Sequence, residues 1–219
     1  MIIETYDLIS RLCYIRAFAP SSRIDRDNAL VRIAWTGTQL HISAYATSYG
    51  AVATWESVPV DDAPGEILLP NAKVKEIIDT FELKGANTQH TPLDVEIGFN
   101  TLRIRRAGNA DEGVPAKSYG YTSEIEHNPP KTCEVFADLG APQFGEPVRM
   151  DPSALIALAA VAKRSEMQVQ FDPYERGVRS TIGPVTAFSR HPIEPEVAEK
   201  AADEDAIAKE ALAGVGGAA

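Results

Sequence analysis

The chain has 219 residues, of which 44% are hydrophobic and 24% are charged, a composition typical of a globular protein. This length is enough for one large or two small domains whose core needs no disulfide or metal to be stable. The longest apolar run, residues 154 to 162, is about half of the roughly 20 residues that a membrane helix needs. The N-terminus also lacks the layout of a signal peptide, so we expect a cytoplasmic protein without a membrane partner.

The formal net charge is -10, from 31 acidic and 21 basic residues. Half of that imbalance lies in residues 194 to 219, which contain seven acidic and two basic residues. Such a chain is repelled by nucleic-acid phosphates unless its basic residues are segregated onto one surface. Residues 195 to 219 are also rich in Ala and Gly, and they are predicted to form a disordered acidic tail.

The residue types that carry out catalysis do not form a recognisable motif in this sequence. Cys13 and Cys133 lack the paired spacing of a zinc or redox site, and the four histidines include no pair at helical spacing. No glycine-rich phosphate loop and no nucleophile elbow is present. The sequence therefore predicts no catalytic residue, no metal site and no cofactor.

Residues 1 to 60 contain a helix followed by three strands. Residues 6 to 19 have apolar side chains at helical spacing, and residues 30 to 42 alternate apolar and polar side chains about a turn at Thr36–Gly37. A further strand is predicted over residues 51 to 58. The helix is expected to bury Leu8, Ile9, Leu12, Ile15 and Phe18.

Residues 64 to 124 repeat this order. A short strand opens at Gly65, and a helix with apolar residues at helical spacing continues to Phe81. Residues 93 to 105 are predicted to form a hairpin that turns at Asn100, and residues 116 to 123 a further strand.

Residues 144 to 194 show the pattern a third time. A short strand is predicted from Gly145, and a helix that begins with Asp151 as its N-cap and Pro152 at its first position. Residues 167 to 179 are predicted to form a hairpin that turns over residues 172 to 174. Residues 184 to 190 complete the unit as a last strand.

The predicted fold is therefore of the α+β class, with repeated β-α-β-β-β units and helices on one face of antiparallel sheets. Residues 1 to 124 are predicted to form one domain of two units, and residues 125 to 143 a linker. Residues 144 to 194 form a third unit, which is either half a domain or a second domain. The linker region is alternatively a degenerate fourth unit.

This unit order resembles the bacterial beta sliding clamps, the processivity factors of replicative DNA polymerases, and the matching stretches cover roughly two thirds of the chain. The resemblance rests also on the Gly-Glu-strand-helix openings at Gly65 and Gly145 and on the segment His191-Pro192-Ile193. It implies helices around a central hole with sheets outside, and the short architecture suggests a phage-encoded relative. Because the family's ring has twelve units, chains of three units are expected to close it as a homo-oligomer of four.

The function that this resemblance implies is that of a non-enzymatic processivity factor that encircles duplex DNA. It implies non-specific DNA binding, and partners that include DNA polymerase and other replication proteins with clamp-binding peptides, with a clamp loader where one is needed. The residues implied for DNA binding are the basic residues of the three helices, namely Arg11, Arg16, Lys73, Lys75, Lys163 and Arg164. The residues implied for a peptide-binding groove are Leu155, Val178, Pro192 and Ile193.

Two other functions stay open from the sequence. One is a clamp-derived binding protein, a decoy or a transcription-associated clamp, that binds partners without encircling DNA. The other is an α+β enzyme whose active site assembles from residues that show no local motif. At the level of single residues, the basic residues are alternatively solvated surface groups, and Leu155 and Val178 are alternatively packing residues.

Overall fold

A computed structural model describes residues 1–20, 29–56, 64–81, 89–109, 111–125, 132–143 and 148–191. The first two predicted units contain all five expected elements, whereas the third has no first strand among the described residues. The first unit consists of β1 (Ile2–Glu4), α1 (Thr5–Arg16), β2 (Leu30–Trp35), β3 (Gln39–Tyr45) and β4 (Tyr49–Glu56). The second consists of β5 (Gly65–Pro70), α2 (Asn71–Thr80), β6 (Pro92–Gly98), β7 (Thr101–Arg106) and β8 (Lys117–Thr122). A short helix, α4 (Thr132–Ala137), precedes the third unit, which consists of α5 (Pro152–Ser165), β9 (Gln170–Tyr174), β10 (Gly177–Ile182) and β11 (Val185–Arg190).

The strands form two antiparallel sheets, and the first two units exchange their first strands. One sheet has the order β1-β6-β7-β8 and the other the order β5-β2-β3-β4-β11-β10-β9. Ile3 of β1 pairs with Leu93 of β6, and Leu69 of β5 pairs with Val31 of β2. Each unit thus supplies an edge strand to the sheet of the other, which ties the two units together.

The third unit extends the sheet of the first. The last strand of the first unit, β4, pairs antiparallel with the last strand of the third, β11, in a register that places Ala53 opposite Val185. Helix α5 contributes Ala157, Leu158 and Val161 to the same apolar core that α1 and α2 fill. The three units therefore share one continuous core, although they are separate repeats in the sequence.

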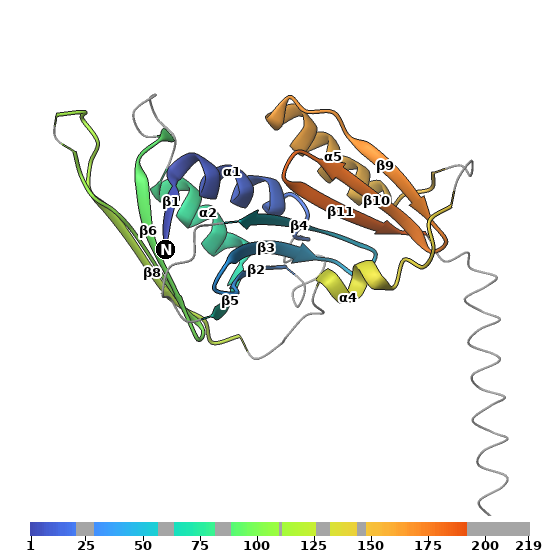
Figure 1. Cartoon of the computed structure of the whole chain (residues 1–219), viewed down its shortest axis with the longest axis horizontal. Coiled ribbons are helices and arrows are strands. Elements are labelled where there is room, and N and C mark those ends of the chain that lie inside the picture. The colour runs from blue at the N-terminus through green and yellow to red at the C-terminus, as the bar shows by residue number, and fades with distance from the viewer. Residues whose placement is uncertain are drawn as a thin grey trace, which may run out of the picture.

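The helices α1, α2 and α5 cover one side of the seven-stranded sheet, whereas α4 lies on the other (Figure 1). The strand period of two accounts for this division. Ala187 of β11 lies in the large core beneath α1 and α5, whereas the next residue, Phe188, packs with Val135 and Leu139 at α4. The α+β fold, with antiparallel sheets and helices packed on them, is confirmed.

Local sequence explains how these elements begin and turn. The Asp151 carboxylate accepts a hydrogen bond from the backbone N–H of Ser153 at 2.7 Å, which caps α5 as predicted. Asn100 turns the β6–β7 hairpin with a φ of 55°, a conformation that Asn tolerates better than most residues do. In β7 the side chains alternate strictly between exposed and buried, as expected for a strand with one solvated face.

Two predictions for the third unit are wrong. Residues 148–150, the described part of the strand expected from Gly145, form no strand. In the first two units this strand pairs with the partner unit, and the described residues contain no such partner for the third. The hairpin turns at Glu175 and Arg176 rather than at residues 172–174, because β9 continues through Pro173, where an outer strand tolerates a missing N–H.

The segment between the second and third units is more structured than a linker. It contains α4, and its residues 141–143 run along the outer edge of β9, where the Gln143 N–H donates to the Pro173 carbonyl at 2.9 Å. Its described residues, 125 and 132–143, contain no strand that would belong to a fourth unit. The predicted domain boundaries at 124, 143 and 194 stay predictions, and the tail over residues 195 to 219 lies outside the described residues.

Candidate nucleic-acid interface

The layer formed by α1, α2 and α5 has a positive charge, although the chain as a whole is strongly acidic. The three helices carry three acidic residues, Asp7, Glu76 and Asp79, against six basic ones, for a net charge of +3. The whole chain has a net charge of -10. The six basic residues are those predicted to bind DNA, namely Arg11, Arg16, Lys73, Lys75, Lys163 and Arg164.

Charges from all three helices meet around Cys13, which lies on α1. Burial raises the pKa of the Cys13 thiol, and the positive charges of Arg164 and Arg16 oppose this rise. The carboxylate of Asp79, on α2, adds to the rise. Helix α1 packs on α2, and α1 and α5 both pack on β4 and β11, so the three helices form one layer on the same side of the sheet (Figure 1).

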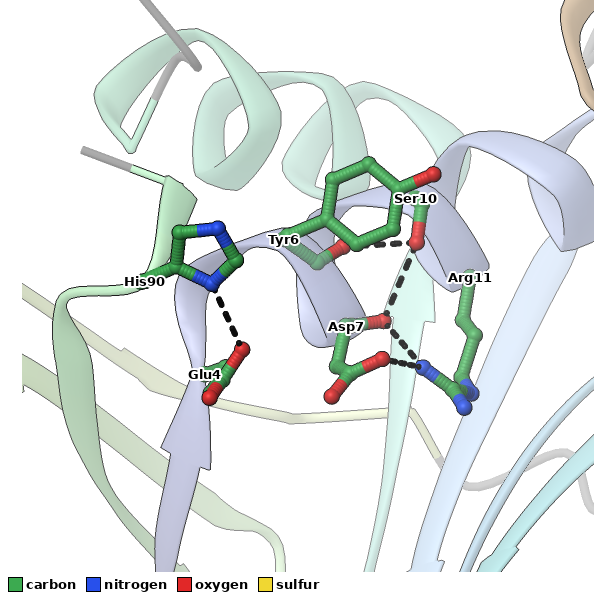
Figure 2. Close-up of polar contacts among 6 residues, drawn as sticks. All are labelled: Glu4, Tyr6, Asp7, Ser10, Arg11 and His90. Atoms are coloured by element: carbon green, nitrogen blue, oxygen red, sulfur yellow. Dashed lines mark hydrogen bonds and ion pairs between the residues drawn. The ribbon is translucent and has the colours of Figure 1, made fainter. Parts of the chain in front are cut away.

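Arg11 is held tightly by its own helix. Its Nη1 donates hydrogen bonds to the Asp7 carboxylate at 2.7 Å and to the Asp7 carbonyl at 2.9 Å (Figure 2). The guanidinium carbon lies 4.9 Å from the centre of the Trp55 ring, within range of a cation–π interaction. The side chain is only 14% exposed, and its buried Nε has no hydrogen-bond partner among the described residues. Arg11 therefore contributes charge to the layer but offers few donors that a ligand could reach.

Arg16 joins two helices. Its Nε donates to Oδ1 of Asn71 at 2.6 Å, which connects the last residue of α1 to the first residue of α2. The rest of the guanidinium can still face a ligand, because one donor out of five is used in this bond.

The lysines of α2 are neutralised locally. Lys73 lies 2.8 Å from Glu76 and Lys75 lies 2.9 Å from Asp79. Such exposed pairs on one helix stabilise it by about 0.3–0.5 kcal/mol each, so the lysines can exchange partners easily. The spacing of Lys73 and Glu76 in the sequence already permits the first of these pairs.

Lys163 and Arg164 are two exposed basic residues at the end of α5. Both side chains are exposed in the last turn of α5, and neither pairs with an acidic side chain in the part of the chain that the structure describes. The helix ends at Glu166, which has a left-handed conformation with a φ of 57°. Positive charge at a helix C-terminus is favourable, and here it also leaves two cations available to an anionic partner.

A second polar cluster lies at the start of α1, where no functional residue was predicted. His90 Nδ1 lies 3.3 Å from Glu4 Oε2, and the Ser10 hydroxyl donates to the Tyr6 carbonyl at 2.6 Å (Figure 2). Glu4 and His90 are 86 residues apart in the sequence, so no local pattern could have paired them. These contacts fix the start of α1 against the segment that enters β6.

Two of the four residues predicted for a peptide-binding groove lie in the described structure, and they differ in burial. Leu155 is exposed on α5, whereas Val178 is fully buried within β10. Pro192 and Ile193 lie outside the described residues. Val178 therefore contributes to packing, and the groove assignment stays a prediction for the other three residues.

The described residues contain neither a candidate metal site nor a candidate membrane-spanning helix. Among the described residues, no three His, Cys, Asp or Glu side chains gather in a way that could hold a metal ion. None of the described helices has both the length and the apolar character that crossing a membrane requires.

Comparison with known proteins places the fold among DNA sliding clamps. The DNA polymerase sliding clamp of Pseudomonas aeruginosa superimposes with a TM-score of 0.58 at 13% sequence identity, covering 87% of this chain and 63% of that chain. The DnaN sliding clamp of Bartonella birtlesii gives 0.57 at 10% identity, with 87% and 64% covered. The beta sliding clamp of Caulobacter crescentus gives 0.57 at 15% identity, with 86% and 63% covered.

At these identities the comparison shows a shared fold. The chain spans slightly less than two thirds of the length of the clamps it matches. No protein-family model and no curated protein sequence matches it. The chain therefore has the sliding-clamp fold, as its sequence suggested, at a sequence identity of only 10–15% to these clamps.

Proposed function

We propose that the protein is a sliding-clamp-like processivity factor whose helix layer faces duplex DNA inside a ring. The observation that carries this proposal is the separation of charge. A layer with a net charge of +3 lies within a chain of net charge -10, on a fold whose solved examples are DNA polymerase sliding clamps. The rest of the chain is acidic in total, which on average opposes DNA binding outside the layer.

The helix layer is suited to sliding rather than to sequence reading. Contacts from Lys163 and Arg164 to phosphates would give affinity without base information. Lys73 and Lys75 would exchange Glu76 and Asp79 for phosphates at little cost, since exposed ion pairs are weak. Several weak contacts of this kind hold DNA while allowing movement along it.

A ring acts by keeping its partner close to DNA. When polymerase is tethered to a closed ring, its effective concentration at the primer end rises, and each dissociation is followed by rapid rebinding. The partners proposed here are DNA polymerase and other replication proteins that carry clamp-binding peptides, with a clamp loader where ring opening needs one. A peptide site that includes Ile193 is tested by titrating such a peptide into Ile193→Asp, and an unaltered binding curve would place the site elsewhere.

Retention on circular DNA tests encirclement directly. The protein is incubated with nicked circular plasmid, separated from free protein by gel filtration in high salt, and the DNA is then cut at one site. A ring stays with the circle and is released by the cut, because linear DNA has ends from which it can slide. Protein that never remains on the circle, or that stays bound after cutting, would contradict encirclement and favour a clamp-derived binding protein.

A matched pair of variants connects retention to the helix layer. Lys163→Glu with Arg164→Glu is expected to abolish retention. Arg103→Glu with Arg105→Glu makes the same charge change on β7, where both arginines are exposed beside Glu96. This second variant is expected to be retained like the wild type, and equal losses in both would show that the effect is not specific to the helix layer.

A further inference from the structure

One side of helix α5 is uncovered in the described structure. The helix contacts β4, β10 and β11, and its buried residues are Ala154, Ala157, Leu158 and Val161. On its other side residues 156, 159, 160 and 163 are exposed, and steps of three, four and seven positions align them along the helix. We call Ile156, Ala159, Ala160 and Lys163 the α5 stripe.

The α5 stripe has an apolar end and a positive end. At the apolar end the Ile156 side chain is 71% exposed. At the other end Lys163 and its neighbour Arg164 have no acidic partner among the described side chains. Ala159 and Ala160 lie between the two ends, and their small side chains let a neighbouring segment approach closely. The stripe is therefore complementary to a segment in which an apolar residue precedes carboxylates.

The last described residue lies beside the start of α5. The Nδ1 of His191 lies 3.3 Å from the carbonyl oxygen of Arg149, two residues before the N-cap Asp151. The backbone N–H of Asp151 donates to the Ser189 hydroxyl at 2.8 Å, which fixes the end of β11 against the start of the helix. Residues 192–219, which lie outside the described residues, therefore continue from a point next to the apolar end of the stripe.

The residues that follow are opposite in charge to the helix layer. Residues 194 to 219 contain seven acidic and two basic side chains, whereas the helix layer has a net charge of +3. Three of the acidic residues, Asp203, Glu204 and Asp205, are consecutive, and we call them the acidic cluster. Exposed charges attract each other within about 8 Å at physiological salt. A segment with no core of its own can still bind a surface of opposite charge.

The order of residues in this segment matches the order along the stripe. His191 and Arg149 are 42 residues apart. The same offset places Val197 level with residue 155, next to Ile156, and it places the acidic cluster level with residues 161–163. An apolar residue thus comes first and the carboxylates follow, as the stripe requires.

The acidic cluster is also within reach of the positive end. Asp203 is twelve residues beyond His191, and Lys163 is twelve residues beyond Asp151. Twelve residues span about 18 Å in a helix and about 40 Å in an extended chain. Since Lys163 is about 18 Å along α5, the cluster reaches it in either conformation.

We propose that the acidic tail of this chain lies along the α5 stripe, with Val197 against Ile156 and the acidic cluster against Lys163 and Arg164. The tail is then an internal competitor for the two basic residues, and a second anionic partner must displace it. The docking itself is independent of DNA. Its consequence, that the tail weakens the first contact with duplex DNA, rests on the proposed function.

Zero-length cross-linking of the full chain with a carbodiimide tests the docking without DNA. The reagent activates a carboxylate, which forms an amide with a lysine amine in contact with it. Trypsin cleaves after Lys200 and Lys209, so the acidic cluster lies in one peptide, residues 201–209. We expect mass spectrometry to find this peptide joined to Lys163. In an equal mixture of isotope-labelled and unlabelled chains, both joined peptides should carry the same isotope, which shows a contact within one chain.

A matched pair of variants connects the cross-link to the stripe. Ile156→Glu replaces an apolar contact with charge repulsion, so the yield of the Lys163 cross-link should fall about fivefold or more. Phe99→Glu makes the same change at the β6–β7 turn, where Phe99 is 90% exposed, and should keep the wild-type yield. Both side chains are exposed, so the variants are expected to fold, and circular dichroism checks that they do.

Three results would overturn the docking. The first is a wild-type chain without the cross-link, which would leave the stripe to another protein. The second is a yield that Ile156→Glu does not change, which would place the tail elsewhere. The third is a joined pair that mixes the two isotopes, which would place the tail on a second copy of the chain.

Neutralising the acidic cluster tests the consequence for DNA. With Asp203→Asn, Glu204→Gln and Asp205→Asn together, the affinity for a short duplex should rise about fivefold, the worth of two exposed ion pairs. The control is Glu194→Gln, Glu196→Gln and Glu199→Gln, an equal charge change that the offset of 42 places before the basic residues, and it should raise affinity less than about twofold. Equal rises would show an effect of total charge and would overturn the competition at the end of α5.

The two arms separate this inference from the proposed function. A cross-link to Lys163 in a chain that does not bind DNA would support the docking and contradict the proposed function. Normal retention on circular DNA without the cross-link would support the proposed function and overturn the docking.

Discussion

Arg16 Nε donates a hydrogen bond to Asn71 Oδ1 at 2.6 Å, and this bond connects two helices that come from different units. Arg16 is the last residue of α1 and Asn71 the first of α2. The bond therefore both fixes the angle between the helices and holds one cation of the helix layer in place. Four predictions follow from this bond and from other contacts of the three units.

Asn71→Ala removes the acceptor of this bond. A hydrogen bond to a charged group contributes about 1.5–3 kcal/mol when well shielded, and since this one is only partly buried we expect a loss of about 1 kcal/mol in the free energy of unfolding. Urea denaturation measures it. Lys75→Ala, which removes one exposed pair, is expected to lose less than about 0.5 kcal/mol. Equal losses in the two variants would show that the bond between the helices contributes no more to the free energy of unfolding than an exposed ion pair does.

Charge reversal in α5 is expected to weaken DNA binding more than charge reversal in α2. Lys163 and Arg164 have no acidic partner among the described side chains, whereas Lys73 and Lys75 are paired. Fluorescence anisotropy with a short duplex, repeated over a range of salt concentrations, measures both affinity and its salt dependence. Each lost phosphate contact lowers the slope of log K against log salt by about 1. If Lys73→Glu with Lys75→Glu changed the slope more than Lys163→Glu with Arg164→Glu, the lysines of α2 would be the more important DNA contacts, against this prediction.

Phe188→Ala is expected to detach α4 from the sheet. The Phe188 ring lies 5.5 Å from the Phe136 ring at 76° and 6.1 Å from the Tyr45 ring, and the side chain is fully buried. Truncation of such a ring costs about 3–5 kcal/mol, which denaturation would measure. Hydrogen exchange should increase first in residues 134–139. Unchanged exchange there, with a loss of stability elsewhere, would contradict this role for Phe188.

The free energy of unfolding is expected to depend on pH through the ionisation of Asp151. Burial alone would raise the pKa of this carboxyl, but hydrogen bonds from Ser48 and from the backbone N–H of Ser153 outweigh it, so the pKa lies below its ordinary value of 3.8. A carboxyl with a lowered pKa in the folded state stabilises the fold above the unfolded pKa, and this contribution is lost as the pH falls through the folded pKa.

The comparison with Asp151→Asn measures that contribution. The difference in unfolding free energy between wild type and variant should be constant well above pH 3.8 and should shrink as the pH falls below it. Urea denaturation at a series of pH values gives the curve. A difference that stays constant throughout the acid range would mean that the charge of Asp151 adds nothing beyond its hydrogen bonds.

Local sequence patterns determined most of the secondary structure. The helical spacing of Leu8, Leu12 and Ile15 and the alternation through β6 and β7 follow from periods of 3.6 and 2 residues, which depend only on the backbone. The cap at Asp151 was predictable for the same reason, since it involves residues two positions apart. The strand expected before α5 does not form in its described part, residues 148–150. A strand needs a partner as well as a pattern, and the described structure contains no partner unit for the third unit.

Pairings between distant residues were decided by the tertiary structure alone. No pattern in the sequence places Ile3 beside Leu93 or Arg11 on Trp55, because these contacts join segments whose separation has no period. In the helix layer, by contrast, Arg11, Lys73 and Lys75 pair with acidic residues three or four positions away, which is a local relationship. Only the bond from Arg16 to Asn71 depends there on the tertiary structure. The sequence by itself thus determined the repeated unit and its α+β class, whereas the exchange of first strands between two units and the pairing of β4 with β11 arose only from packing, which depends on contacts across the whole chain.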